Sequence, residues 1–147
     1  MAVWTTPITD RTANDVAYAK ANQNESADLK GAWNISDANR VINNTIYLRD
    51  LLNQYGYTVE FDDQPLLTEA DFPYRDSVIK VMKDNINAVV NAFYEFNNPT
   101  IMYGTTASYT GANTMEINLD ITNTLLENLI SNLLYCGEPY SGDTITL

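Results

Sequence analysis

The stretch that decides the fold is Ser36-Asp-Ala-Asn-Arg-Val-Ile-Asn-Asn-Thr-Ile-Tyr-Leu-Arg-Asp-Leu-Leu52. Apolar or small side chains recur in it at steps of three and four residues, which places them on one face of a helix. The members of this stripe are Val41, Thr45, Leu48, Leu52 and Tyr55, widened by Ile42, Ile46 and Leu51. Ser36 or Asp37 can cap the start, because a short side-chain oxygen accepts from the free amides of a first turn. We expect a helix over about 37–55 that ends before Gly56.

The same spacing returns in two later segments. A second helix is predicted from Pro73, behind Asp71 as its cap, to about Phe96, with its apolar stripe at Val78, Met82, Ile86, Val89 and Phe93. Residues 115–121 alternate as in a strand, but a helical stripe also runs through Met115, Leu119, Thr122, Leu126, Leu129 and Leu133. That run is too long for one strand, so we expect a helix over about 111–134. The predicted fold class is mainly α, a small bundle of about three long helices.

The segments around these helices are less regular. Residues 1–31 predict an extended N-terminal arm, in which residues 13–21 can form a short helix capped by Thr12 or Asn14. Residues 32–147 then form the bundle domain with a turn-rich C-terminal tail. Short peripheral strands are expected at 57–61 and 101–103. An exposed Trp on an arm is costly, so Trp4 should dock on the helices or on a neighbouring subunit.

Composition excludes several classes of function. The net charge of −11 argues against nucleic acid and against anionic membrane surfaces. No apolar run approaches a membrane span and no signal-peptide pattern opens the chain, so we expect a soluble protein without conventional export. The chain has no histidine, which excludes Ser-His-Asp and Cys-His nucleophiles and every His-containing zinc site. Cys136 is the single cysteine, so neither an internal disulfide nor a cysteine-only zinc site can form. We expect no metal and no cofactor.

Three groups of residues remain that could carry chemistry. Two carboxylates suffice for a glycosidase, and five acids gather in sequence: Asp62, Asp63, Glu69, Asp71 and Asp76. We favour a solvated acidic surface for them. Tyrosines near loops (Tyr103, Tyr109, Tyr135 and Tyr140) could contact protein or sugar, although partial burial is the commoner role. Cys136 is expected to be a small buried or half-buried thiol, because no basic neighbour lowers its pKa.

A weak internal repeat relates the three helices. In each, an aliphatic residue is followed three positions later by an asparagine beside the apolar stripe: Asn44, Asn85 and Asn118. Such an amide could satisfy the backbone of an arm or loop that crosses the bundle, or it could face water. Arg40 can pair with Asp37 or with an acid on another element.

Two stretches carry a family resemblance. Trp4-Thr-Thr-Pro-Ile-Thr-Asp10, followed by Asp37-Ala-Asn-Arg-Val-Ile-Asn-Asn-Thr-Ile-Tyr-Leu48, resembles a group of phage and prophage virion proteins from Gram-positive gut bacteria. That group has a W-T-x-P-x-T-D start and a D-x-N-R-[IV]-x-x-N helix, and residues 136–143 are similar to its G-E-x-Y-x-G-E ending. The chain departs from the pattern at Arg11, where an aromatic residue is common. Members are associated with tail, baseplate or tail-fibre modules, so the resemblance implies a structural role without catalytic residues.

Our first hypothesis is therefore a non-enzymatic virion structural protein, a homo-oligomer that contacts other tail subunits. It would be made in the cytoplasm of the bacterial host and reside in the phage particle, with neither nucleic acid nor membrane insertion. The residues expected at its interfaces are Trp4, Pro7, Asp10, Trp33, Asn39, Arg40 and Asn44. The alternatives are a host-surface glycan-binding module that uses the loop tyrosines, a small carboxylate-dependent hydrolase, and an intracellular helical adaptor.

Overall fold

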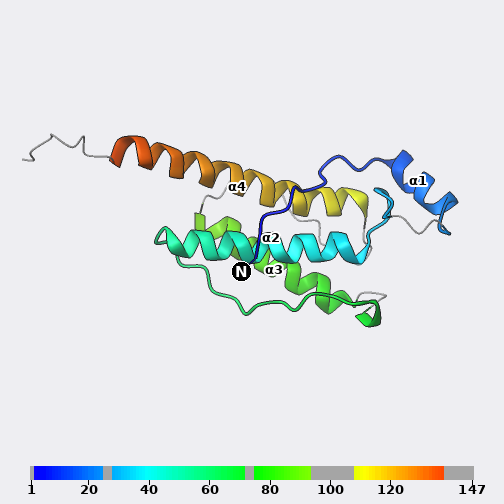
Figure 1. Cartoon of the computed structure of the whole chain (residues 1–147). Helices are drawn as coiled ribbons and strands as arrows, with labels where there is room; N and C mark the ends of the chain where they lie inside the picture. Colours follow the sequence, from blue (N-terminus) through cyan, green and yellow to red (C-terminus); the bar gives the residue numbers. More distant parts are fainter. Residues whose placement is uncertain (1, 25–27, 72–74, 94–107, 138–147) are drawn as a thin grey trace, which may run out of the picture.

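The computed structural model describes residues 2–24, 28–71, 75–93 and 108–137, with side chains up to residue 132. In these ranges four α-helices form: α1 (Ala13–Ala21), α2 (Ile35–Gln54), α3 (Asp76–Phe93) and α4 (Tyr109–Gly137). A short 3₁₀ turn, η1 (Glu69–Asp71), precedes α3. The long helices α2, α3 and α4 pack against one another, and α1 lies at one end of them (Figure 1). The mainly α fold class is confirmed. The expected count of about three helices is too low, because residues 13–21, where a short helix was expected only as a possibility, form α1.

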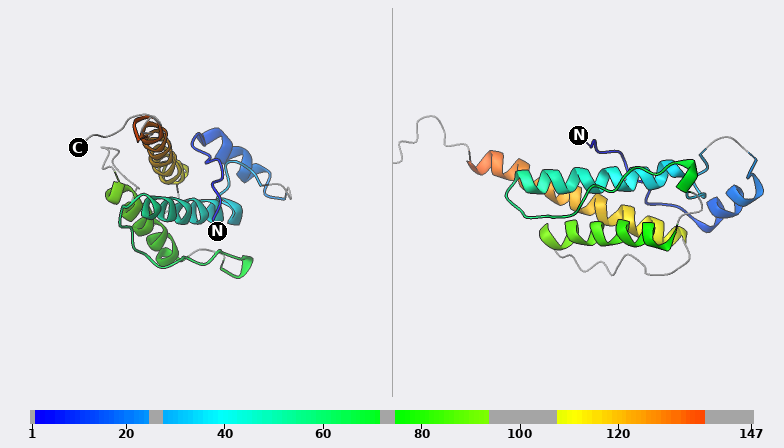
Figure 2. Two further views of the ribbon diagram at one scale, coloured as in Figure 1. Left: turned by 60° about the vertical axis from the view of Figure 1, so that its left-hand side comes forward. Right: turned by 90° about the horizontal axis from the view of Figure 1, so that it is seen from below.

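The three long helices lie against one another (Figure 2), and the core lies where they meet. Its centre is apolar and almost fully buried, at 0–2% exposure: Val41, Leu48 and Leu52 from α2, Met82, Ile86 and Val89 from α3, and Leu119 and Leu126 from α4. These residues belong to the three predicted stripes, since a stripe at helical spacing must face the other helices to leave water. Tyr55 is the exception and is 39% exposed, because the chain leaves the helix there.

The start of α2 differs from the prediction. The helix begins at Ile35, and Asn34 occupies the cap position in place of Ser36 or Asp37. Asp37 sits in the first turn, and its Oδ2 accepts from the Asn34 backbone N–H at 3.0 Å. This backward bond still satisfies one free amide and places a negative charge at the positive end of the helix dipole.

The end of α2 follows the prediction. Gly56 adopts a φ of 89°, in the left-handed region that glycine enters without steric cost. The Gly56 N–H then donates to the Asn53 carbonyl at 3.2 Å, and the Tyr57 N–H donates to the Leu52 carbonyl at 3.0 Å. These two bonds satisfy carbonyls that the helix end leaves free and turn the chain back along the bundle.

Helix α3 starts later than predicted, its predicted end at Phe96 lies outside the described residues, and α4 also differs from its predicted bounds. The prediction that Asp71 caps α3 is wrong: α3 starts at Asp76, and Asp71 instead accepts from the Thr68 backbone N–H in η1. Pro73 lies outside the described residues. The ambiguous segment from Met115 is helical, and α4 is longer than predicted at both ends. Its C-terminal part extends past the ends of α2 and α3 (Figures 1 and 2).

No strand forms in the described part of the chain, so the strand expected at 57–61 is wrong. That segment is extended but has no strand beside it. Its Val59 peptide pairs with the side chain of Asn53 on α2, which donates to the Val59 carbonyl at 3.0 Å and accepts from its N–H at 2.9 Å. A helix amide thus takes the place of a neighbouring strand. The strand expected at 101–103 and the C-terminal tail lie outside the described residues.

The N-terminal segment 2–11, which we call the arm, is extended and crosses α2 and α4 before it enters α1 (Figures 1 and 2). Thr12 caps α1 as one of the two predicted candidates, in a reciprocal pairing with Asp15. Trp4 is half-buried against the core, and its ring centroid lies 5.8 Å from that of Tyr47 on α2. The expected docking of Trp4 on the helices is confirmed. None of the helices in the described ranges has the apolar length that a bilayer crossing needs.

Candidate functional site

Four charged side chains from three parts of the chain meet where the arm crosses the bundle. Arg11 comes from the arm, Asp37 and Arg40 from the first turns of α2, and Glu116 from α4. Arg11 Nη2 lies 2.8 Å from both Asp37 Oδ1 and Glu116 Oε1. The side chains of Arg11, Asp37 and Glu116 are only 2%, 6% and 1% exposed. Two cations and two anions balance here, which is the condition under which buried charges are tolerated.

Glu116 is the centre of this cluster. Its Oε1 accepts from Arg11 and from Arg40 Nη2, each at 2.8 Å, and its Oε2 accepts from Arg40 Nε at 2.8 Å and from the Ile8 backbone N–H at 2.7 Å. Arg40 thus binds the carboxylate with two donors, a geometry that a lysine cannot supply. Burial on its own lowers the pKa of Arg40, but its hydrogen bonds to Glu116 and Asp37 outweigh burial and raise the pKa. Arg40 therefore remains a fixed cation.

Two asparagines hold the backbone of the arm on either side of the ion cluster. Asn44 on α2 accepts from the Thr5 N–H at 2.9 Å and donates to the Thr5 carbonyl at 2.7 Å. Asn113 on α4 does the same for Arg11, with bonds of 3.1 and 2.9 Å. Each amide reproduces the donor and acceptor pair that a neighbouring strand would offer, which satisfies an extended backbone that has no sheet. We call Asp37, Arg40, Asn44, Asn113 and Glu116 together the arm site.

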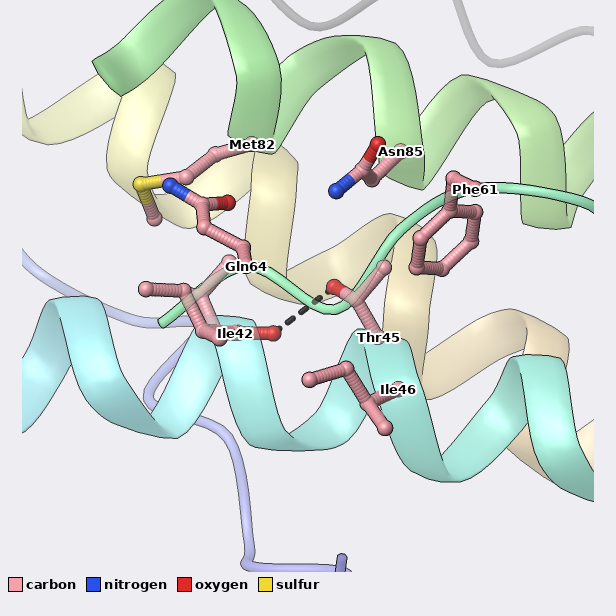
Figure 3. A pocket seen from close by; sticks show the side chains of 8 residues that line it. Ile42, Thr45, Ile46, Phe61, Gln64, Met82 and Asn85 are labelled. Carbon is pink, nitrogen blue, oxygen red and sulfur yellow. Dashed lines mark hydrogen bonds between the residues drawn. The ribbon is translucent and has the colours of Figure 1, made fainter. Parts of the chain in front are cut away.

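Only part of the role expected for the repeated helix asparagines is seen in the structure. Asn44 has the role expected for an amide beside the stripe, and Asn39 plays the same role for the Leu67 peptide, with bonds of 3.0 and 2.7 Å. Asn118 is buried on α4. Asn85 is half-buried on α3 beside a narrow space between α2, α3 and the segment that follows α2 (Figure 3). This space is too narrow for a water molecule, so Gln64 and Asn85 do not enclose a ligand site there.

Trp33 covers the ion cluster from the segment before α2. The Arg11 guanidinium carbon lies 5.5 Å from the centre of the Trp33 ring, within range of a cation–π contact. Arg11 Nε and the Trp33 indole N–H are buried and have no hydrogen-bond partner among the described residues. The ring contact offsets part of the free energy that it costs to remove the Arg11 charge from water. The two unpaired N–H donors add to that cost.

The structure brings most of the predicted interface residues together within one chain. Asn44 binds the Thr5 peptide of the arm, and Arg40 binds Glu116, which in turn accepts from Ile8 and Arg11. Trp4 of the arm packs against Tyr47, and the Trp33 ring lies beside Arg11. Pro7 is half-buried between the Asn44 and Glu116 contacts and has no N–H to satisfy. Two residues lie apart. Asp10 is exposed and pairs with Lys30 at 2.8 Å, a bond that lowers the pKa of Asp10, and Asn39 holds the segment after α2.

The acids proposed for a hydrolase do not converge. Asp62, Asp63, Glu69, Asp71 and Asp76 are all exposed. Asp63 pairs with Arg49, whose guanidinium also packs 5.0 Å from the centre of the Phe61 ring, and Asp71 is held by Thr68. Of the loop tyrosines, Tyr109 is half-buried at the start of α4. Tyr103 and Tyr140, and the side chains of Tyr135 and Cys136, lie outside the described part.

Two residues of the arm site, Asn113 and Glu116, were not singled out from the sequence, and Arg11, which binds there, was noted only as a departure from the family pattern. Glu116 carried a usable signal, because it lies within the apolar stripe of α4, next to Met115 and three residues before Leu119. A carboxylate on a buried face needs a cation, and the chain has only 8 lysines and arginines in all. Arg11 carried the matching signal as the single basic side chain of segment 2–11. Which cation meets which anion depended on the packing.

No protein-family model, curated protein sequence or solved structure matches this chain. The arm site therefore has to be interpreted from its own geometry.

Proposed function

We propose that this protein is a non-enzymatic structural subunit of a phage virion, in a tail, baseplate or tail-fibre module, that acts through contacts between subunits. The observation that carries the proposal is that the two stretches with the family resemblance interlock in space. Thr5 pairs with Asn44, and Trp4 packs against Tyr47. Residues of the two stretches therefore act together to hold an extended segment on a helix.

The chemistry of the arm site supports a mechanical role. Every carboxylate oxygen in it already accepts an N–H: Asp37 from Arg11 and Asn34, and Glu116 from Arg11, Arg40 and Ile8. A general base needs a free lone pair facing its substrate, and a nucleophile needs an open approach. Each oxygen of Glu116 accepts from two N–H donors, and the side chains of Asp37 and Glu116 are only 6% and 1% exposed, so this arrangement favours a role in fixing geometry.

The test is the protein content of purified phage particles. We expect mass spectrometry of particles from the producing strain to detect this chain at a fixed ratio to the other tail proteins. Antibody labelling in the electron microscope should place it on the tail. Deletion of the gene should give particles that lack a tail component. Complete, infectious particles that never contain this chain would rule the proposal out.

A matched pair of variants tests whether the bound arm is needed for the protein to enter particles. In a deletion strain, a chain with Arg11→Ala should fail to enter particles, because the arm loses the residue that bridges Asp37 and Glu116. A chain with Arg75→Ala, which removes an exposed arginine outside the arm site, should enter them normally. Purified protein on a cell-wall glycan array distinguishes the alternative role: sugar binding that is retained by a chain excluded from particles would favour a glycan-binding module.

A further inference from the structure

We propose that the arm is exchanged between copies of this chain, so that Arg11 of one copy completes the Asp37, Arg40 and Glu116 cluster of another. The inference rests on the proposed function in one respect: an assembly of many copies keeps neighbouring arms at the high local concentration that exchange requires. The partner is a second copy of the same chain, and the surface it occupies is the arm site.

The contacts of the arm do not depend on its covalent link to the body. Its polar bonds join residues far apart in sequence: Arg11 to Asp37 across 26 positions, Thr5 to Asn44 across 39, and Ile8 to Glu116 across 108. The bond of Arg11 Nη1 to the Ile8 carbonyl lies within the arm and moves with it. An arm from another copy presents the same groups, so the arm site binds either one with the same contacts.

In its described residues, 12–24 and 28–34, the connection between the arm and α2 is held by ion pairs more exposed than those of the arm. It runs through α1 and the loop that follows, and Ala19 is the one buried residue of α1. The ion pairs found in the described residues of this connection are surface pairs, Lys30 with Asp10 at 2.8 Å and with Asp15 at 3.8 Å. Such pairs contribute little, whereas the ion pairs of Arg11 with Asp37 and Glu116 are almost fully buried. Breaking the ion pairs of the connection that lie in its described residues therefore costs less than breaking those of the arm.

Gly31 of this connection packs tightly against the backbone of α1. A Cβ built on Gly31 would lie 1.9 Å from the Asp15 carbonyl oxygen, a distance that no side chain can adopt without moving one of the two backbones. The return of the chain from α1 to α2 in one copy therefore depends on glycine at this position. A side chain there opposes the closed connection and leaves every group of the arm site unchanged. Substitution of Gly31 thus tests exchange without weakening the bonds that would hold an exchanged arm.

The experiment compares full-length wild type, Gly31→Ala and a matched control, Gly111→Ala, by sedimentation over a range of concentrations. In the control the new Cβ meets only the Ser108 hydroxyl, at 3.3 Å. We expect Gly31→Ala to dimerise at a concentration at least about tenfold lower than wild type, since tenfold corresponds to only about 1.4 kcal/mol of opposition to closure. Gly111→Ala should match wild type. A Gly31→Ala chain that stays monomeric, with or without a docked arm, overturns the proposal.

Two further readouts identify the dimer as an exchanged one. Adding Asn44→Ala to Gly31→Ala removes both bonds to the Thr5 peptide without creating a charge and should abolish the dimer. In a mixture of isotope-labelled and unlabelled copies, protons of Trp4 should show contacts to Tyr47 of the other copy, because the two ring centroids lie 5.8 Å apart. A dimer that survives Asn44→Ala, or that shows these contacts within one copy only, contradicts exchange.

The outcomes separate this inference from the proposed function. If Gly31→Ala does not fold, the labelled mixture of wild-type copies at high concentration gives the same decision from the Trp4 and Tyr47 contacts. Exchange in solution with no protein in particles would refute the virion role and leave exchange standing. Detection of the protein in particles, together with a strictly monomeric Gly31→Ala chain, would refute exchange and leave the virion role standing.

Discussion

Arg11 and Glu116 lie 105 positions apart in the chain and meet at 2.8 Å in the interior, each almost fully buried. This pair joins the first residues of the protein to its last described helix. It also places the arm across the start of α2, because Arg11 reaches Asp37 with the same nitrogen. The arm is therefore part of the folded body, and the stability of the bundle and the position of the arm are coupled through one guanidinium group.

Removal of Arg11 should both destabilise the protein and release the arm. We expect Arg11→Ala to lower the free energy of unfolding by about 3–5 kcal/mol, because Asp37 and Glu116 would then share one cation in the interior. Chemical denaturation monitored by far-ultraviolet circular dichroism measures the loss. Arg75→Ala should change the stability by no more than about 0.5 kcal/mol. An equal effect of the two substitutions would show that the cluster contributes nothing specific.

The Asn44 amide should be sensitive to a change of a single group. We expect Asn44→Asp to destabilise the protein by about 2–3 kcal/mol, because the new carboxylate still accepts from the Thr5 N–H but faces the Thr5 carbonyl without a donor. Thermal unfolding at neutral pH measures this. Asn14→Ala, an exposed amide on α1, serves as the control and should leave the melting temperature nearly unchanged. Retained stability in Asn44→Asp would mean that the Thr5 pairing is not formed in solution.

Two of the asparagines of α2, Asn39 and Asn44, should protect different parts of the backbone. Asn39→Ala should speed amide hydrogen exchange at Leu67, and Asn44→Ala should speed it at Thr5, because each amide is the acceptor for that N–H. Exchange measured residue by residue by NMR provides the comparison. If either substitution exposed both segments equally, the segments would open as one unit, and the separate pairing described here would be incorrect.

Gly56 should tolerate asparagine better than alanine. No atom lies within 4 Å of a Cβ built at Gly56, so the cost arises from the backbone φ of 89° and from no clash. We expect Gly56→Ala to lower the free energy of unfolding by about 1 kcal/mol, since residues with a Cβ disfavour the left-handed region. Gly56→Asn should cost less, because asparagine visits that region more readily. A larger loss for asparagine than for alanine in urea denaturation would contradict this account.

The cap of α1 should depend on pH with a defined sign. The Thr12 hydroxyl, together with the Thr12 backbone N–H, holds the pKa of Asp15 below its ordinary value of 3.8. A carboxylate whose pKa is lowered by folding stabilises the folded state above its unfolded pKa. That contribution is lost as the pH falls below 3.8 and through the lower folded pKa. NMR titration of the Asp15 carboxyl should show the lowered pKa, and Thr12→Val should raise it. A titration that is identical in both chains would exclude the hydroxyl as the cause.

Much of the bundle could be predicted from the spacing of apolar residues. The stripe from Val41 to Leu52 places α2 correctly, and the long stripe from Met115 resolves the choice between strand and helix. Gly56 correctly marks the end of α2. The strand prediction failed because the extended segment pairs with a helix side chain and has no second strand beside it. The segment 57–61 alternates as a strand does, but Asn53 of α2 pairs with its backbone in place of another strand.

The contacts of the arm site could likewise be predicted only in part from the sequence. Asn44 could be singled out, because an amide beside an apolar stripe needs a hydrogen-bond partner. Its partner, the Thr5 peptide, could not be identified, since a backbone group carries no mark in the sequence. Arg40 was expected to pair with Asp37 or with an acid elsewhere, and the structure has both, with Glu116 as the distant acid.

By itself, the sequence determined a mainly helical body, the limits of α2 to within two residues and the exclusion of histidine-dependent chemistry, because periodicity and residue type act locally. Only the tertiary structure decided that the arm folds back on α2 and α4, and that Arg11, Asp37, Arg40 and Glu116 share one buried site. The physical reason is that a buried charge is stable only beside its opposite. Which charges become neighbours depends on how the three long helices pack, which no local pattern encodes.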